Sequence, residues 1–237
     1  KVKIEGLISG KGKVQNPGSK MIITGDFDTK YLRLNNDSLG EGSINRFIYD
    51  NNTTNLQAHI TNPDPLHKID ATVNIYLDGK HTDNLISIKA QRYYLDFLDM
   101  FLGNLFSDLQ GFITADIDIK GPLDRLNFIG KARLHDAGLK IKFTQVFYKV
   151  RDAEINFREH ELDFGVLKLT DTITKNTATF AGSIQHEGWK NMFYDLEAKT
   201  DGRPMTLLNT KEGDNAAFYG HAIGTGSMIL IGPQSDM

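Results

Sequence analysis

The chain has 237 residues, of which 40% are hydrophobic and 24% are charged, and these are ordinary values for a globular protein. They exclude a disordered or collagen-like chain, and the length suits one large β-rich domain or two smaller domains. The 27 Lys and Arg residues against 30 Asp and Glu residues give a net charge of -3. No broad cationic surface is therefore expected, and nucleic acid is not an expected partner.

The absence of cysteine excludes disulfides, thiolate zinc sites and a cysteine nucleophile, and it leaves the redox compartment open. No stretch reaches the ~20 apolar residues that span a bilayer. The most apolar stretch, residues 93–106, is interrupted by Asp96, Asp99, Gly103 and Asn104. Because the sequence begins inside a predicted strand without Met or a signal peptide, we expect it to be a segment of a longer protein.

Alternation of apolar and polar residues with a period of two dominates the chain and predicts strands with one apolar face. The clearest run alternates Ile113, Ala115, Ile117 and Ile119 with polar residues. The apolar phase shifts across Gly165, which predicts a β-bulge there. In chain order, strands are expected around residues 2–8, 69–77, 113–120, 125–135, 153–157, 161–170 and 178–184.

Turn signals rich in Gly, Pro, Asn and Asp separate these runs at residues 16–18, 36–38, 50–54, 62–65, 78–79 and 121–122. Successive strands lack the intervening helix that a parallel βαβ unit requires, so the sequence predicts an antiparallel meander. No linker or change of composition divides the chain. We therefore expect an all-β protein in which residues 1–237 form a single elongated unit.

Two short helices are expected to interrupt the strands. The first covers residues 94–109, where Leu95, Leu98, Leu102 and Phe106 fall on one side at helical spacing. The second covers residues 204–208, because Pro204 suits the first turn of a helix.

Residue patterns for catalysis or metal binding are almost absent. The seven histidines form no His-x-His or His-Glu-x-x-His motif, and no serine lies in a Gly-x-Ser-x-Gly frame. The pairs Asp26 with Asp28 and Asp116 with Asp118 are spaced by two, so each pair is expected on the solvated face of its strand. We therefore predict no enzyme activity, no metal site and no cofactor.

A series of amphipathic strands with few helices must bury its apolar face in some way. The sheet packs on a second sheet, closes into a barrel, or keeps the face for a hydrophobic ligand. Periodicity alone favours a packed sandwich or barrel, because apolar faces usually form a core.

Several short motifs follow one another in a characteristic order over about half of the chain. They are Ser-Asp-Leu-Gln-Gly at 107–111, Ala-Asp-Ile-Asp-Ile-Lys-Gly-Pro-Leu at 115–123, Phe-Ile-Gly-Lys-Ala at 128–132, Gly-Ser-Ile-Gln-His at 182–186, Leu-Leu-Asn-Thr at 207–210 and Ala-Phe-Tyr-Gly at 217–220. This order resembles the TamB family of translocation and assembly proteins in its Bacteroidetes-like form, and more broadly the AsmA-like bridge proteins of Gram-negative envelopes.

The resemblance implies a periplasmic body of antiparallel strands curled into a taco-like hydrophobic groove. It also implies an inner-membrane anchor and an Omp85-class outer-membrane partner elsewhere in the system, and no catalytic residues. The implied roles are phospholipid transfer between the two membranes and assistance to outer-membrane biogenesis and protein secretion.

Together, the alternation and the resemblance suggest that apolar strand residues hold phospholipid acyl chains while the head group stays in water. The helix over 94–109 would then cover the mouth or rim of the groove, or would simply pack in the core. The expected lining residues are Ile113, Ile117, Leu126, Phe128, Leu134, Ile155, Phe157 and Phe180.

Two alternatives use the same strands differently. The sheet could offer an exposed edge to a strand of an unfolded outer-membrane protein, in which case backbone hydrogen bonds would dominate binding. A surface-binding or carbohydrate-acting β-domain would need aromatic platforms or paired carboxylates, for which the single Trp189 gives little support.

Overall fold

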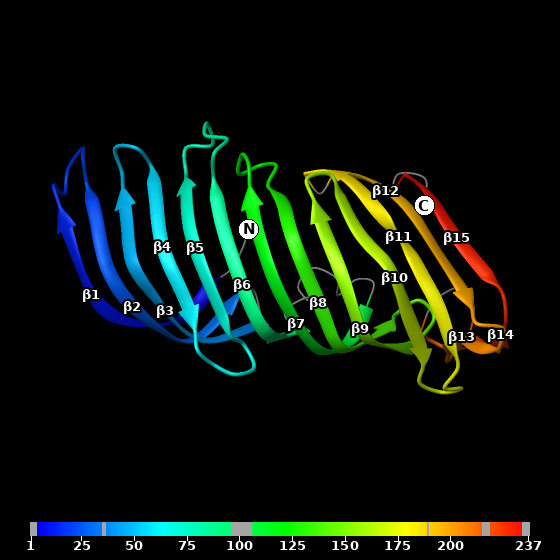
Figure 1. Cartoon of the computed structure of the whole chain (residues 1–237). Helices are drawn as coiled ribbons and strands as arrows, with labels where there is room; N and C mark the ends of the chain where they lie inside the picture. Colours follow the sequence, from blue (N-terminus) through cyan, green and yellow to red (C-terminus); the bar gives the residue numbers. More distant parts are fainter. Residues whose placement is uncertain (1–3, 35–36, 96–105, 189, 215–218, 234–237) are drawn as a thin grey trace.

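The computed structural model describes residues 4–34, 37–95, 106–188, 190–214 and 219–233. In these residues the protein is all-β and contains no helical element, which confirms the predicted fold class. Thirteen strands form one large sheet, and β13 and β14 form a separate two-stranded hairpin near the C-terminal end (Figure 1).

The strands are long, and most are joined by tight turns. Those of the large sheet are β1 (Ile4–Gln15), β2 (Ile22–Leu34), β3 (Asp37–Asp50), β4 (Asn55–Asn62), β5 (Ile69–Tyr76), β6 (Leu85–Tyr94), β7 (Phe106–Lys120), β8 (Asn127–Ile141), β9 (Val146–Arg158), β10 (Glu161–Asp171), β11 (Thr177–Glu187), β12 (Lys190–Thr200) and β15 (Ser227–Pro233). The hairpin consists of β13 (Met205–Thr210) and β14 (Gly220–Gly224).

The predicted antiparallel meander is confirmed. From β1 to β12 each strand pairs with the next one along the chain, and β15 pairs with β12 after the chain has made the hairpin. All pairings in the sheet are antiparallel, so short turns suffice to join the strands. The two open edges of the sheet are β1 and β15.

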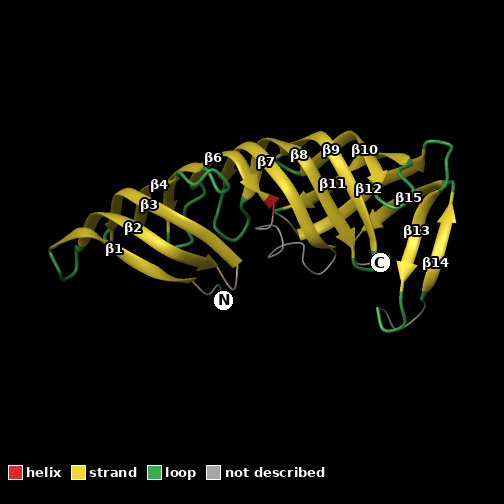
Figure 2. Ribbon diagram, turned by 90° about the horizontal axis from the view of Figure 1, so that it is seen from below, coloured by secondary structure: helices red, strands yellow, loops and turns green. Residues whose placement is uncertain are grey.

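The sheet is bent but does not close on itself (Figure 2), and it is not strongly curled, so a taco-like groove is not confirmed. Bulges contribute to the bend, because each one adds a residue to one strand and increases the local twist. The predicted bulge at Gly165 is confirmed, since the register shifts between Asp163 and Val166 and Gly165 has a φ of 56°. Residues with positive φ at other register shifts are Tyr31, Arg46, Arg92 and Asp108.

The two predicted helices are wrong where the structure describes them. Strand β6 continues to Tyr94 and β7 begins at Phe106, so both ends of the 94–109 stretch are extended. Leu98 and Leu102 lie outside the described residues. The 204–208 stretch belongs to β13, because Met205 and Thr206 bury their side chains and pair with β14. At the described strand positions of both stretches, tertiary pairing overrides a local helical pattern.

Candidate functional site on the apolar face

One row of directly opposed residues crosses all thirteen strands of the sheet without a single charged member. Opposed residues in an antiparallel sheet carry their side chains on the same face, so the row marks one side of the sheet, called here the apolar face. The apolar row consists of Gly10, Phe27, Ile44, Ile60, Ala71, Ile88, Ile117, Gly130, Phe157, Leu162, Ile184, Tyr194 and Gly232.

Most side chains of the apolar row are only half-buried. Ala71 is buried and Gly10 is exposed, and the other members lie between these two classes. The row is therefore neither a closed core nor a fully solvated surface. Apart from Ala71 on β5, its members leave some area accessible along the sheet, which is unusual for large aliphatic and aromatic side chains in a packed domain.

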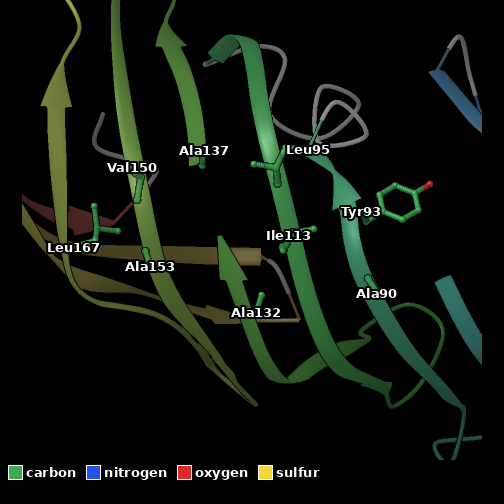
Figure 3. Close-up of a cluster of buried hydrophobic side chains, with 9 residues drawn as sticks. All are labelled: Ala90, Tyr93, Leu95, Ile113, Ala132, Ala137, Val150, Ala153 and Leu167. Atoms are coloured by element: carbon green, nitrogen blue, oxygen red, sulfur yellow. The ribbon is translucent and has the colours of Figure 1, made fainter. Parts of the chain in front are cut away.

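Parallel to the row, further apolar positions widen the same face. Tyr93, Ile113, Leu134 and Ala153 are opposed to one another on β6 to β9. Figure 3 shows the nine most buried members of this region, which come from the neighbouring strands β6 to β10 and from Leu95. Four of the nine are alanines. Small side chains beside large ones make this part of the face uneven.

The opposite side of the sheet, called the polar face, carries the charges. Lys131 donates to Glu154 at 3.1 Å, and the Nε atom of Arg133 donates to Asp152 at 2.8 Å. The hydrogen bond from Arg133 holds the pKa of Asp152 below its usual value. A shallow depression of about 330 Å³ on this face is lined by charged residues such as Lys89. These exposed pairs contribute little to stability and keep the polar face solvated.

The acidic pairs singled out in the sequence lie where they were expected. Asp116 is exposed on the polar face, and Asp118 there accepts a hydrogen bond from Ser87 at 2.6 Å. Asp26 and Asp28 are exposed and accept hydrogen bonds from the backbone of Arg46 and from Ser43. Neither pair is arranged for acid–base chemistry on the apolar face.

The predicted lining residues are on the apolar face, with one exception. Ile113 is buried, and Ile117, Leu134, Phe157 and Phe180 pack against the buried cluster. Phe128 lies 6.4 Å from Phe157 between ring centroids, and Ile155 is opposed to Ala132 on the same face, whereas Leu126 precedes β8 and lies in the turn.

Two of the four expected rim residues lie within the described part of the chain. Leu95 is 3% exposed and belongs to the buried cluster, and Phe106 is half-buried at the start of β7. Tyr94 ends β6 and residues 106–109 belong to β7, and Leu98 and Leu102 lie outside the described residues. The rim role of these four residues stays a prediction.

The total accessible surface is large for the mass of the chain. A compact monomer of 26.6 kDa has an accessible surface of about 10,700 Å² by the usual scaling. The observed value is 14618 Å². This excess agrees with a single open sheet and does not suit the closed sandwich or barrel that periodicity alone favoured.

The hairpin β13–β14 packs against the apolar side of β9 and β10 near the ends of these strands. Tyr148 donates its hydroxyl proton to the carbonyl oxygen of Thr206 at 2.7 Å. The backbone N–H of Thr206 donates to a carboxylate oxygen of Asp171 at 2.7 Å. Asp171, Thr206 and Val146 are fully buried at this contact. Figure 2 shows the hairpin standing at an angle to the large sheet.

Asp171 is a buried carboxylate held by several donors. Besides Thr206, it accepts from the hydroxyl of Thr174 at 2.6 Å and from the backbone N–H of Ile173 at 2.8 Å. Burial by itself raises the pKa of Asp171, but the three donors outweigh burial and the pKa is lowered below its ordinary value. Burial and the nearby Asp171 charge also raise the pKa of Tyr148 to about 12.

Sequence reasoning missed the role of the hairpin. Pro204 suggested a helix start, and nothing in the spacing of Asp171 and Thr206, which are 35 residues apart, indicates that they meet. It also missed the members of the apolar row on β2 to β4, among them Phe27 and Ile44. Their strands contain bulges that hide a simple alternation.

His59, His67 and His81 each contact a carboxylate, whereas His135 contacts the hydroxyl of Thr114 at 3.0 Å. His59 contacts Asp70 at 3.0 Å, and His67 contacts Asp64 at 3.3 Å. Among the residues that the structure describes, no group of three or more His, Asp or Glu side chains could hold a metal ion.

The same ranges contain no helix that is long and apolar enough to cross a membrane.

Comparisons of the chain with family models, with curated proteins and with solved structures each found no match. The resemblance to the TamB family therefore stays a prediction from the sequence.

Proposed function

We propose that the chain is part of a periplasmic bridge of the TamB type and that its apolar face carries phospholipid acyl chains between the two membranes. The observation that carries the proposal is the apolar row, which crosses thirteen strands without a charge and keeps apolar surface accessible. The proposal includes an inner-membrane anchor and an Omp85-class outer-membrane partner, both supplied outside the residues described.

The physical need for such a surface is set by the hydrophobic effect. Exposing two acyl chains with ~30 methylenes to water costs on the order of 25 kcal/mol, at about 0.8 kcal/mol per methylene. A continuous apolar surface removes most of this cost at every step of the movement. A charged residue anywhere on the path would restore a barrier, because an unpaired charge beside hydrocarbon is strongly unfavourable.

The direction of the row suits transport better than storage. Thirteen strands at a spacing of about 4.8 Å extend over about 58 Å across the sheet. An extended acyl chain is much shorter than this distance. The face therefore offers a track with many equivalent positions, and not one pocket sized for one ligand.

Lipid extraction from the purified chain, read by native mass spectrometry, tests the proposal. We expect bound phospholipid in the wild-type chain and its loss in Ile117→Asp, which places a carboxylate in the middle of the apolar row. The matched control is Ile129→Asp, the same change on the polar face of the adjacent strand, where Ile129 is opposed to Asp118. Circular dichroism reports whether both variants keep the β-structure.

Ile60→Asp provides a second variant on β4, well away from Ile117, should Ile117→Asp fail to fold. It is expected to reduce lipid occupancy as well, because the path requires every strand to be apolar. Lipid retained in a folded Ile117→Asp or Ile60→Asp variant, or lost equally in Ile129→Asp, would contradict the proposal.

A further inference from the structure

The hairpin β13–β14 is held to the large sheet by polar contacts along β13. Thr206 is bonded to both Tyr148 and Asp171, and the backbone N–H of Asn209 donates to the carbonyl oxygen of Thr144 at 2.8 Å. A single hydrogen bond of this kind adds little net stability, because the same groups bond to water when they separate. The docked position of the hairpin therefore depends on a few individually weak contacts.

Little of the hairpin is buried apart from the beginning of β13. Met205 and Thr206 are buried, but Leu207 is 47% exposed and Ile223 on β14 is 49% exposed. Among the described strands, β14 pairs only with β13. A two-stranded hairpin alone is marginally stable in water, so this hairpin depends on its contact with β9 and β10.

The chain is fixed to the large sheet just before and just after the hairpin. The backbone N–H of Thr200 donates to the carbonyl oxygen of Gly226 at 3.0 Å, and the N–H of Gly226 donates to Oγ1 of Thr200 at 3.0 Å. The N–H of Asp201 bonds to the first residue of β11. Gly202 follows with a φ of 77° and open space around it, and Gly224 ends β14. Short connections that contain glycine thus join the hairpin to a fixed base.

The docked hairpin covers the apolar face where β9 begins. Val146, Tyr148 and Val150 alternate along this strand and share its apolar face. Val146 is fully buried at the hairpin contact, and Val150 belongs to the buried cluster. Farther along β9, Ile155 and Phe157 lead to the apolar row. With the hairpin swung away, apolar side chains would connect this rim of the sheet to the row.

We propose that the hairpin β13–β14 is a hinged flap over a side entrance, formed by Val146, Tyr148 and Val150, through which phospholipid acyl chains reach the apolar face. The flap pivots at Gly202 and Gly224 while its base stays paired with the sheet. An acyl chain occupies the entrance only when the hairpin is undocked, so lipid shifts the population toward the open state. The movement needs no lipid, whereas the use of the entrance rests on the proposed lipid path.

Hydrogen exchange in the absence of lipid tests the movement. The amides of Thr206 and Asn209 bond to the large sheet only while the hairpin is docked. They should exchange by local opening, at least about 10-fold faster than the amide of Ala132 in the buried cluster. Tyr148→Phe removes one hydrogen bond to the hairpin and should speed Thr206 exchange about 5-fold. Tyr49→Phe is the matched control on β3 and should not change it.

A disulfide lock tests the entrance, since the natural chain has no cysteine and the backbones of Thr144 and Asn209 are in contact. In the double variant Thr144→Cys with Asn209→Cys, oxidation should slow the uptake of fluorescent phospholipid from vesicles of phosphatidylethanolamine and phosphatidylglycerol by about 10-fold or more. Reduction should restore uptake. Thr72→Cys with Ser87→Cys is the matched control, because it cross-links opposed residues on the polar face of β5 and β6, away from the hairpin.

Tyr148→Phe tests the entrance independently of the lock, because a flap that opens more often should raise the rate of lipid uptake. Thr206 and Asn209 amides that exchange as slowly as the amide of Ala132 would overturn the flap. Uptake unchanged by the oxidised lock, or by Tyr148→Phe despite faster Thr206 exchange, would overturn the entrance. A wild-type chain that takes up no lipid would instead contradict the proposed lipid path, and the entrance with it, while the exchange data would still report the movement.

Discussion

Glycine at position 130 illustrates how single residues shape the apolar row. Gly130 lies between Ile117 and Phe157 and has a φ of 146°. A Cβ atom at this position would lie 2.1 Å from the carbonyl oxygen of Asp116 and 2.9 Å from the Cα of Ile117. Because the neighbouring strands approach closely here and the φ is positive, the position requires glycine. The large side chains of Ile117 and Phe157 therefore flank a position that has no side chain.

Gly130→Ala is therefore expected to destabilise the fold by about 2–4 kcal/mol, from backbone strain and from the clash with β7. Chemical denaturation measures the free energy of unfolding. Gly18→Ala is the control, because nothing lies within 4 Å of a Cβ atom at Gly18, and its effect should stay below about 0.5 kcal/mol. Equal effects of the two substitutions would refute the packing explanation for Gly130.

Strands and turns were predictable from the sequence because each depends on neighbouring residues. Alternation identifies the strand β7 with its run from Ile113 to Ile119, and the phase change at Gly165 identifies a bulge. The helix over 94–109 is wrong at its described ends, because leucines spaced as in 95–106 suit a helical face, while Tyr94 and residues 106–109 are held by strand partners far away in sequence. Pro204 likewise directly precedes a strand and not a helix, because its neighbour Met205 is buried in the hairpin contact.

The hairpin β13–β14 depends on a long-range contact that local patterns do not encode. Its docking combines the carboxylate of Asp171 with the backbone N–H of Thr206, and Asp171 remains charged because its donors lower its pKa. A carboxylate with a lowered folded-state pKa contributes stability above its ordinary pKa of 3.8, and this contribution disappears as the pH falls through the lower folded value.

We therefore expect hairpin docking to be constant near neutral pH and to weaken below about pH 4. Asp171→Asn should weaken hairpin docking by about 1–3 kcal/mol at neutral pH, because an NH2 donor replaces one of the two carboxylate oxygens that accept hydrogen bonds. It should also remove the acid dependence, because the Asn side chain does not titrate. Hydrogen exchange at the Thr206 amide measures the docking. Asp152→Asn, which removes the exposed partner of Arg133, should leave this amide unchanged. Slow Thr206 exchange in Asp171→Asn would contradict the assigned role.

At the scale of the whole molecule, the sequence indicated which residues are apolar but not how they line up. The row from Gly10 to Gly232 depends on the register of every pair of strands, and register depends on turn lengths and bulges that alternation does not reveal. Five of the eight predicted lining residues flank the row without being in it, namely Ile113, Phe128, Leu134, Ile155 and Phe180. The continuity of the apolar face therefore emerges only from the assembled sheet.

The open architecture follows from the same continuity. Thirteen strands joined mainly by short turns build a broad sheet, and the hairpin β13–β14 packs over part of its apolar side. A sandwich would hide this face, but the measured surface of 14618 Å² is that of a much less compact chain. Apolar residues that would normally form a core are left half-buried along the sheet, and this is the property on which lipid carriage depends.

The most direct test of a continuous lipid path is photo-cross-linking along the apolar row. A photoreactive amino acid at Phe27, Phe157 or Tyr194 samples the beginning, middle and end of the row, and one at Asn156 samples the polar face beside Phe157. In chains purified from a Gram-negative envelope, the account predicts phospholipid adducts at all three row positions and none at Asn156. Adducts confined to one row position, or equally abundant at Asn156, would contradict it.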